Sequence, residues 1–283
     1  RRAVEAVAPL LPVGRVRVVS YPAGCKDLND VLLKHSSSEV MQAVLNAAQW
    51  RPDGVLAAST LWELVSKRPE KGDAYPWEDL NRWTYGIRRK EMVVIGAGTG
   101  VGKTTWFKAL EHCLAVTQGI KVGVIHLEES PRDTLLGLMA MHAGVPFHVP
   151  GADYSDEDKR KAFEAVTTGD KLLIYDCFGA SDADTITRQI RYMASAGCQY
   201  VFLDHLTALT DGASDERSVN QLTRNIVSSL AMLIRELDIG LFAISHLRKT
   251  SEGRSHEEGG RVHLDDLYGA AAIKQWASFV FGL

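Results

Sequence analysis

The sequence lacks the features that mark several broad classes of protein. Its 4 cysteines in 283 residues form no Cys-x-x-Cys pair, so neither a zinc site nor a disulfide framework is indicated. We expect all four thiols, those of Cys25, Cys113, Cys177 and Cys198, to be reduced and buried. No apolar run reaches the roughly 18 residues of a membrane span, and the N-terminus lacks the apolar core of a signal peptide. These absences favour a cytoplasmic protein without a membrane partner.

An excess of positive charge is also missing. Lys and Arg number 32 against 35 Asp and Glu, and the formal net charge is −3. A uniformly basic surface that holds nucleic acid by bulk attraction is thereby excluded, so any contact with phosphate groups has to be local. The rest of the composition is that of an ordinary globular protein, with 46% hydrophobic residues. The chain starts without Met and stops inside an apolar run, residues 276–283, so we expect a fragment at both ends.

From Lys71 onward, short aliphatic runs alternate with helical patterns, which predicts an α/β fold with a mostly parallel sheet flanked by helices. The predicted strands are residues 92–95, 122–127, 172–175, 200–203 and 241–244. Apolar stripes at helical spacing predict core-facing helices over 182–196 and 219–237. The stripe residues are Ile186, Ile190 and Met193 in the first helix, and Val219, Leu222, Ile226, Leu230, Leu233 and Leu237 in the second. Five such strands suffice for a doubly wound nucleotide-binding domain.

The segment before Lys71 has a different character. Residues 16–20 read as one strand and 39–49 as one helix, and the Pro- and Gly-containing stretch 50–54 reads as a break. After the break, Ser59 is placed to cap a short amphipathic helix that carries Leu61, Leu64 and Val65. This apolar stripe packs either within the chain or on a neighbouring subunit, and the sequence leaves both readings open. We therefore divide the chain into residues 1–50, 51–75 and 76–283.

The strongest motif is a glycine-rich loop between a strand and a helix, Gly96-Ala-Gly-Thr-Gly-Val-Gly-Lys-Thr-Thr105. Glycines let successive backbone N–H groups curl around an anion, and the helix N-terminus adds its positive end. Lys103 supplies a charge for the β- and γ-phosphates, and Thr104 offers a hydroxyl to Mg²⁺. Ala97 replaces the usual first glycine of the pattern. The predicted nucleotide-binding residues are Gly98, Gly100, Val101, Gly102, Lys103, Thr104 and Thr105.

Carboxylates at the ends of two predicted strands complete a candidate active site. Asp204 ends an apolar strand, where such a residue holds the Mg²⁺ shell in phosphate-loop enzymes. Without the phosphate loop upstream, a strand-ending Asp is more often a helix cap or a turn residue. Glu128 follows the strand 122–127 and is the predicted group that orients water near the γ-phosphate. Its rival is Glu129, and both glutamates also suit the start of the helix that Ser130 and Pro131 predict.

Further motifs follow one another in a fixed order: Leu127-Glu-Glu-Ser130, Leu203-Asp-His-Leu206, Ser214-Asp-Glu-Arg217, Ser245-His-Leu-Arg248, Ser255-His-Glu-Glu-Gly259 and the segment from Asp266 to Gln275. From about Trp50 to Leu283 this series resembles the helicase domain of T-odd bacteriophage primase-helicases. Mitochondrial Twinkle helicase and bacterial DnaB helicases are similar at a greater distance. The resemblance implies a RecA-like phosphate-loop ATPase that moves along single-stranded DNA and unwinds duplex DNA. A phage-encoded protein would act in the host cytoplasm.

The resemblance also implies roles for single residues. His246 matches the family's γ-phosphate sensor, and Gln275 matches a position that couples nucleotide to DNA. Basic residues of the family's DNA-binding loops correspond to Arg248, Lys249, Arg254, His256 and Lys274. Three basic side chains in one Gly- and Ser-containing loop suit sequence-tolerant contacts with successive phosphates. Three glutamates in the same loop, at 252, 257 and 258, oppose that attraction, so a merely solvated loop is the alternative.

The implied assembly is a ring, six subunits in the family, that uses ATP, dTTP or another nucleoside triphosphate with Mg²⁺. A replicative DNA polymerase is a further implied partner. Gly24–Leu32 resembles the trailing end of a Toprim primase domain, in which Asp27 would be the last acidic metal-site position. Family members complete the ATP site with an arginine from the neighbouring subunit, on a strand that would follow Leu283. We therefore expect this chain to bind nucleotide better than it hydrolyses it.

Two other classes of function stay open. A RecA-like recombinase or clock-type ATPase would share the phosphate loop, but would lack the Toprim-like segment and the motifs at 214–217 and 255–259. A DNA loader that uses ATP only as a switch would need no group to activate water. The presence of Glu128 and His246 therefore disfavours a loader.

Overall fold

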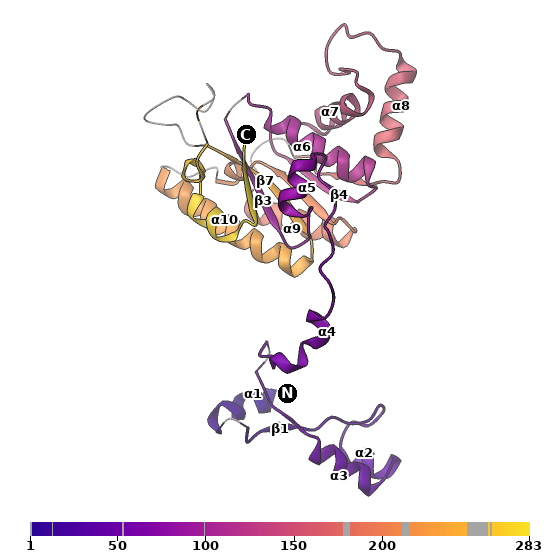
Figure 1. Cartoon of the computed structure of the whole chain (residues 1–283), viewed down its shortest axis with the longest axis vertical. Coiled ribbons are helices and arrows are strands. Elements are labelled where there is room, and N and C mark those ends of the chain that lie inside the picture. Colours follow the sequence, from indigo (N-terminus) through magenta and orange to yellow (C-terminus); the bar gives the residue numbers. More distant parts are fainter. Residues whose placement is uncertain are drawn as a thin grey trace. The chain divides into compact units, whose positions relative to one another are not determined.

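The computed structural model describes residues 2–12, 14–52, 54–98, 100–177, 182–210, 216–247, 260 and 262–283. The chain forms two compact units, Arg1–Glu70 and Lys71–Leu283. The larger unit is built on a six-stranded sheet with the order β5-β4-β6-β7-β3-β8 (Figure 1). Its strands are β3 (Met92–Ala97), β4 (Val122–His126), β5 (Leu172–Ile174), β6 (Tyr200–Asp204), β7 (Gly240–His246) and β8 (Phe279–Gly282).

Every neighbouring pair in this sheet is parallel, so all six strands end at the same edge. All residues of β3, β4 and β6 are buried, as expected for strands covered by helices on both faces. The mostly parallel α/β fold predicted from the sequence is confirmed. Each strand predicted for this unit lies within two residues of its observed bounds.

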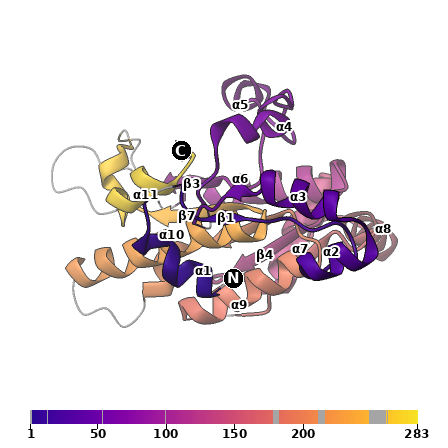
Figure 2. The same cartoon turned by 90° about the horizontal axis from the view of Figure 1, so that it is seen from below.

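Helices pack on both faces of the sheet and create two main cores. They are α5 (Glu78–Thr84), α6 (Lys103–His112), α7 (Pro131–Ala143), α8 (Asp156–Thr167), α9 (Ala183–Ser195), α10 (Glu216–Leu237) and α11 (Ala270–Trp276). Ile190 of α9 and Leu230 of α10 pack in one core, and Phe107 and Leu110 of α6 pack in the other. Figure 2 shows α9 and α10 on the opposite side of the strands from α6.

Helices α7 and α8 contact each other and share a third, smaller core. Ser130 caps α7, and its side chain accepts a hydrogen bond from the Asp133 backbone N–H. Ser155 caps α8 in a reciprocal capping box with Asp158. Both helices therefore begin where serine oxygens satisfy backbone donors that the helix leaves free.

The smaller unit contains short elements. They are α1 (Arg2–Val7), β1 (Arg17–Val18), α2 (Leu28–Lys34), α3 (Ser37–Leu45), β2 (Ala48–Gln49) and α4 (Trp62–Val65), with 3-10 turns at Ala8–Leu10 and Ala58–Thr60. Strands β1 and β2 form a separate antiparallel pair. Asp27 caps α2 by accepting a hydrogen bond from the Asp30 backbone N–H at 2.8 Å. None of the described helices is long and apolar enough to cross a membrane.

Several local expectations were wrong. The helix expected over 39–49 ends at Leu45, because Ala48–Gln49 pairs with β1. Ser59 caps no helix: it lies inside the 3-10 turn, and α4 begins after Leu61 without a side-chain cap. Leu222 is 40% exposed, because the buried face of this part of α10 is formed by Thr223, Ile226 and Val227 instead. All four cysteines are thiols outside any disulfide, but only Cys113 and Cys198 are buried.

Candidate functional site

Four strands bring polar residues to one edge of the sheet. The register pairs Ala97 at the end of β3 with His246 at the end of β7, and His126 at the end of β4 with Asp204 at the end of β6. The carboxyl ends of parallel strands are where open α/β sheets bind ligands. The glycine-rich loop, Glu128, Asp204 and His246 therefore converge on one edge, although they lie far apart in the sequence.

The glycine-rich loop leads directly into α6. Gly100 has φ 78° and Gly102 has φ 95°, a left-handed conformation that L side chains rarely adopt. A Cβ atom added at either position would meet nothing within 4 Å, so the left-handed backbone, and not crowding, requires glycine there. Lys103 and Thr104 form the first turn of α6. Gly98 is buried, whereas Val101 and Thr105 are exposed.

Lys103 is 9% exposed and donates a hydrogen bond from Nζ to Nδ1 of His246 at 3.1 Å. Burial, together with the nearby His205 and Lys103, lowers the pKa of His246 to about 4. His246 is therefore neutral at pH 7. Because its Nδ1 accepts from Lys103, its proton lies on Nε2, which is free to donate to an anion. Among the described residues Lys103 has no carboxylate partner.

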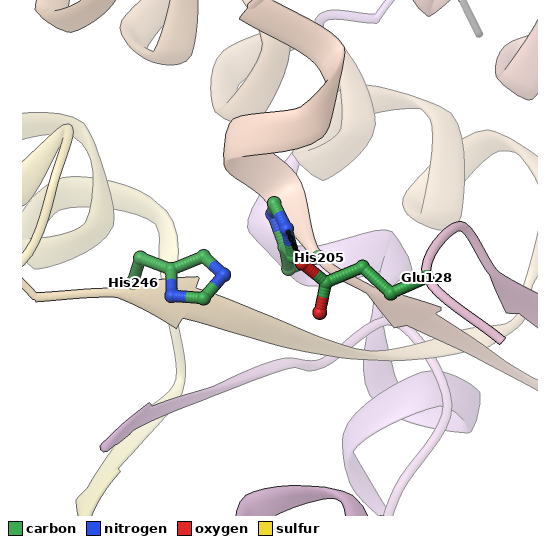
Figure 3. Close-up of side chains that lie close together, drawn as sticks. All are labelled: Glu128, His205 and His246. Atoms are coloured by element: carbon green, nitrogen blue, oxygen red, sulfur yellow. Dashed lines mark hydrogen bonds and ion pairs between the residues drawn. The ribbon is translucent and has the colours of Figure 1, made fainter. Parts of the chain in front are cut away.

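Glu128 lies on the other side of the same space (Figure 3). The Ala208 backbone N–H donates to Nδ1 of His205 at 2.9 Å, so Nε2 of His205 carries the proton and donates to Oε1 of Glu128 at 2.9 Å. The rings of His205 and His246 lie edge to face, with centroids 4.0 Å apart. The side chain of Glu128 is 56% exposed, which leaves its second oxygen accessible to water.

Asp204 suits a metal shell. It is 3% exposed, and its Oδ1 has no hydrogen-bond partner among the described residues. Burial raises the pKa of this carboxyl, and His126 and His205 act against that rise. A buried carboxylate oxygen without a donor is costly unless a cation or ordered water meets it. Asp204 and the Thr104 hydroxyl therefore fit Mg²⁺ bound to a nucleotide, since oxygen is the ligand that Mg²⁺ prefers.

Glu128, His205 and His246 also offer three ligand atoms within 4.8 Å of one another. Three such groups at this spacing are a candidate transition-metal site. The ammonium of Lys103, 3.1 Å from His246, opposes a cation in this space and favours an anion. The arrangement therefore suits a phosphate better than a second metal.

The structure separates the two rival glutamates. Glu129 bonds to Lys108 of α6, and its side chain is 25% exposed. Glu128 instead bonds to His205 beside His246, and its role in activating water stays a prediction.

Of the remaining predicted residues, two lie on α11 and four lie outside the described part of the chain. Gln275 and Lys274 lie on α11, and Lys274 forms an ion pair with Asp265. The segment before α11 reaches the site through the Tyr268 backbone N–H, which donates to the His246 carbonyl at 3.3 Å. Four predicted DNA-binding residues lie outside the described part of the chain: Arg248, Lys249, Arg254 and His256.

Sequence reasoning assigned no role to His205, which holds Glu128, or to His126, which lies buried behind it. The position of His205 directly after Asp204 was an available signal. A histidine at the end of an otherwise apolar strand, as at position 126, was a second signal.

A glycine-rich phosphate loop, a strand-ending aspartate and a further carboxylate at the same edge of a parallel sheet are features of the RecA-like phosphate-loop fold. The family model described as the DnaB-like helicase C terminal domain matches residues 74–283. The chain belongs to this family.

Relatives extend the same picture. The DNA helicase/primase of Enterobacteria phage T3 is 30% identical over 298 aligned positions, which cover 100% of this chain and 51% of the relative. The replicative DNA helicase DnaB of Geobacillus stearothermophilus is 22% identical over 71% of this chain and 44% of its own length. The chain thus spans about half the length of these curated relatives.

Solved structures agree on the fold. One that is described as an ATPase domain superposes with a TM-score of 0.67 at 24% identity, covering 82% of this chain and 84% of that one. A DnaB-like replicative helicase, described with its interactions with primase, gives 0.64 at 20% identity over 99% of this chain and 64% of its own.

Proposed function

We propose that the chain is the motor part of a replicative helicase, which hydrolyses a nucleoside triphosphate and uses the energy to move along single-stranded DNA. The observation that carries this proposal is the convergence of Lys103, Glu128 and His246 around one space behind the glycine-rich loop. An ATP-binding adaptor would need the loop but not Glu128. Membership of the DnaB-like family supports DNA as the track.

In this proposal each side chain of the site has one task. Lys103 and the loop N–H groups bind the β- and γ-phosphates. Thr104 and Asp204 would hold Mg²⁺, which would supply positive charge against the phosphates. Glu128 orients the attacking water and takes its proton, while His205 fixes the direction of the carboxylate. His246 donates from Nε2 to the γ-phosphate, and a change at His246 reaches Tyr268 through the backbone hydrogen bond between them.

DNA contact is assigned by resemblance to Arg248, Lys249, Arg254, His256 and Lys274, with Gln275 as a coupling residue. Lys274 can exchange its exposed Asp265 partner for a phosphate, because surface ion pairs are weak. Single substitutions of these basic residues to Ala should weaken DNA binding and reduce its salt dependence.

Self-association is supported by two apolar surfaces. On α4, Trp62 and Leu64 are 72% and 73% exposed. Between α7 and α8 lies a cavity of about 530 Å³ with an apolar floor that includes Met139 and Phe163, and a basic rim that includes Arg132. We assign α4 of a second copy to this groove, since the acidic Glu63 beside Trp62 suits the basic rim.

This contact is tested by Trp62→Ala together with Leu64→Ala. The variant should remain folded and lose higher-order assembly in analytical ultracentrifugation with nucleotide and Mg²⁺, whereas Phe163→Ala should give the same loss from the other side. Unchanged assembly in both variants removes α4 as the docking element. The ring and its size of six subunits follow from the family resemblance alone.

The N-terminal unit is assigned to the end of a Toprim primase domain. The match to the phage T3 helicase/primase extends over this unit, whereas the helicase family model begins at residue 74. Asp27 is the expected acidic position, and its carboxylate caps α2. A DNA polymerase partner is proposed on the resemblance only.

Strand displacement tests the proposed function. A motor releases the labelled strand of a forked duplex when nucleotide and Mg²⁺ are present, and the Lys103→Ala variant does not. A loader that uses ATP as a switch would bind the fork with and without nucleotide but would not release the strand. That result would contradict the motor function and favour an ATP-dependent switch.

A further inference from the structure

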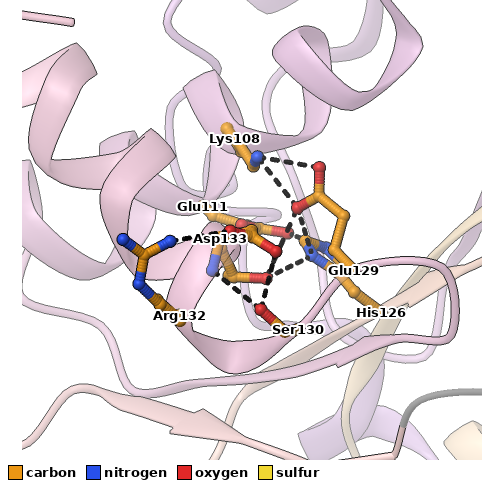
Figure 4. A network of polar contacts seen from close by, with 8 residues as sticks. Lys108, Glu111, His126, Glu129, Ser130, Arg132 and Asp133 are labelled. Atoms are coloured by element: carbon orange, nitrogen blue, oxygen red, sulfur yellow. Dashed lines mark hydrogen bonds and ion pairs between the residues drawn. The ribbon is translucent and has the colours of Figure 1, made fainter. Parts of the chain in front are cut away.

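A second set of charged side chains is buried behind the site, where the end of β4 meets α6 and α7 (Figure 4). His126 is 2% exposed, and its Nε2 lies 2.8 Å from Oε1 of Glu111, which is fully buried. Nδ1 of His126 lies 3.1 Å from the Thr134 hydroxyl and 3.7 Å from Oε2 of Glu129. Glu129 in turn accepts from Nζ of Lys108 at 2.8 and 3.0 Å.

The charges in this network support one another. Burial disfavours a charged imidazole, but Glu111 and Glu129 outweigh it and raise the pKa of His126 to about 10. Burial likewise disfavours a charged Glu129, but His126 and Lys108 lower its pKa to about 2. At neutral pH an imidazolium therefore lies between two carboxylates, and both ring nitrogens are protonated.

Stability alone does not account for this arrangement. Oε2 of Glu111 is buried without a hydrogen-bond partner among the described residues. Replacing a buried ion pair by apolar residues of similar volume is often neutral or stabilising, because it removes the cost of taking charges out of water. Because the network costs energy to bury and lies beside the site, we look for its role in holding the residues of the site in position.

The four side chains of the network come from two elements that form the site. Lys108 and Glu111 lie on α6, the helix whose first residue is Lys103. His126 and Glu129 lie on either side of Glu128 in the chain. Glu129 is bound on the α6 side, while Glu128 bonds to His205 on the other. The network thus ties the phosphate-binding helix to the segment that presents Glu128.

We propose that the buried network of Glu111, His126, Glu129 and Lys108 positions Glu128 against the phosphate site, with His126 as its central positioning residue. The inference rests on the proposed function, in which Glu128 activates water. None of the four residues touches the nucleotide in this scheme. Loosening the network turns Glu128 away from the water and slows hydrolysis, while the glycine-rich loop still binds nucleotide.

The test uses a variant that keeps the packing and removes the charges. Glu111→Leu together with His126→Leu should fold with a melting temperature near that of the wild type. It should bind a fluorescent ATP analogue with unchanged affinity. The single-turnover hydrolysis rate should fall about 10- to 100-fold, since small displacements of a catalytic group have effects of that size. The single variant His126→Leu leaves Glu111 buried and unpaired, so it should be strongly destabilised.

A folded double variant that hydrolyses ATP at the wild-type rate overturns the proposal, and so does one that has lost nucleotide affinity. If the double variant does not fold, Lys108→Met and Lys108→Arg decide the matter. Lys108→Met should slow hydrolysis without changing affinity, and Lys108→Arg should restore the rate, because it keeps the ion pair to Glu129. Equal rates for the two overturn the proposal.

Two controls separate this inference from the proposed function. Arg191→Ala with Glu236→Ala removes an exposed ion pair between α9 and α10 that is not part of the network, and it should change neither rate nor affinity. Glu128→Gln should slow hydrolysis about 10²- to 10⁴-fold. If Glu128→Gln hydrolyses ATP like the wild type, the proposed function fails at its catalytic group, whatever the network variants do.

Discussion

Two clusters of glutamate, histidine and lysine lie on opposite sides of the end of β4, and they differ in their access to water. In the open cluster Glu128 is 56% exposed, and the neutral His246 accepts from Lys103. In the closed cluster His126 is 2% exposed and lies between two carboxylates. The open cluster thus leaves an oxygen of Glu128 accessible to water, whereas the side chains of the closed cluster bind mainly one another. Consecutive residues, Glu128 and Glu129, belong to different clusters.

The largest expected effect comes from removing the cation of the open cluster. Lys103→Ala should lower nucleotide hydrolysis by about 10³-fold or more, because the charge that stabilises the transferring phosphate is lost. Lys108→Met, which removes the lysine of the closed cluster, should leave nucleotide affinity unchanged. Hydrolysis assays measure the rate for Lys103→Ala, and equilibrium titration with a fluorescent nucleotide compares the nucleotide affinities of the two variants. Equal losses of affinity would erase the distinction between the clusters.

The consecutive glutamates give the second comparison. Glu128→Gln should slow hydrolysis about 10²- to 10⁴-fold with nucleotide binding retained, since a general base is lost. Glu129→Gln should lower the melting temperature and slow hydrolysis less than Glu128→Gln does, because Lys108 and His126 lose a charged partner while Glu128 itself is kept. Single-turnover hydrolysis and thermal unfolding measured on both variants check this. A catalytic defect as large in Glu129→Gln would show that Glu128 was wrongly assigned.

His126, which is buried, and His246, which is partly buried, should respond to pH in opposite directions. The folded-state pKa of His126 is raised from 6.5 to about 10, so its stabilising contribution is complete below pH 6.5 and is lost as pH rises through 10. The folded-state pKa of His246 is lowered to about 4, so its contribution is complete above pH 6.5 and is lost as pH falls toward 4.

Both effects are measured by recording melting temperatures from about pH 4 to about pH 10, the range between the folded-state pKa values of His246 and His126. The variant Glu111→Leu with His126→Leu should lose the alkaline part of the decline and keep the acidic part, whereas His246→Gln should do the reverse. An alkaline decline that is identical in the wild type and the double variant would remove the charged state assigned to His126.

The smallest effect belongs to an ion pair that lies in neither cluster. Arg191 and Glu236 form a two-fold hydrogen-bonded pair between α9 and α10, but both side chains are about half exposed. Replacing both by Ala should change the melting temperature by no more than about 2 °C, because solvent screens exposed pairs. A larger change would mean that ion pairing itself, and not burial, sets the closed cluster apart.

The fold and the open cluster were accessible from the sequence because their signals are local. Strands buried on both faces read as short aliphatic runs, and the phosphate loop needs glycines at fixed spacing. The strand ends then follow from topology, since parallel strands bring Asp204, Glu128 and His246 to one edge. The roles of these residues remain predictions until the variants above are measured.

The closed cluster was not accessible, because its signals are not local. Glu111 looks like an ordinary polar residue on a helix, and its burial against His126 depends on how α6 packs on the sheet. The same limit explains the errors at Ser59 and Leu222. A serine caps a helix only if the backbone enters the helix at that residue, which it does not do at Ser59. An apolar residue at helical spacing is buried only where another element packs against that part of the helix, and Leu222 stays exposed.

The most direct test of the proposed function is nucleotide hydrolysis by this chain within its full-length protein, with and without single-stranded DNA, beside the Lys103→Ala variant. The account predicts that DNA raises the rate of the wild type several-fold and that Lys103→Ala stays at background with or without DNA. Hydrolysis that depends on Lys103 but ignores DNA would contradict the translocating motor and leave an ATP-driven switch in its place.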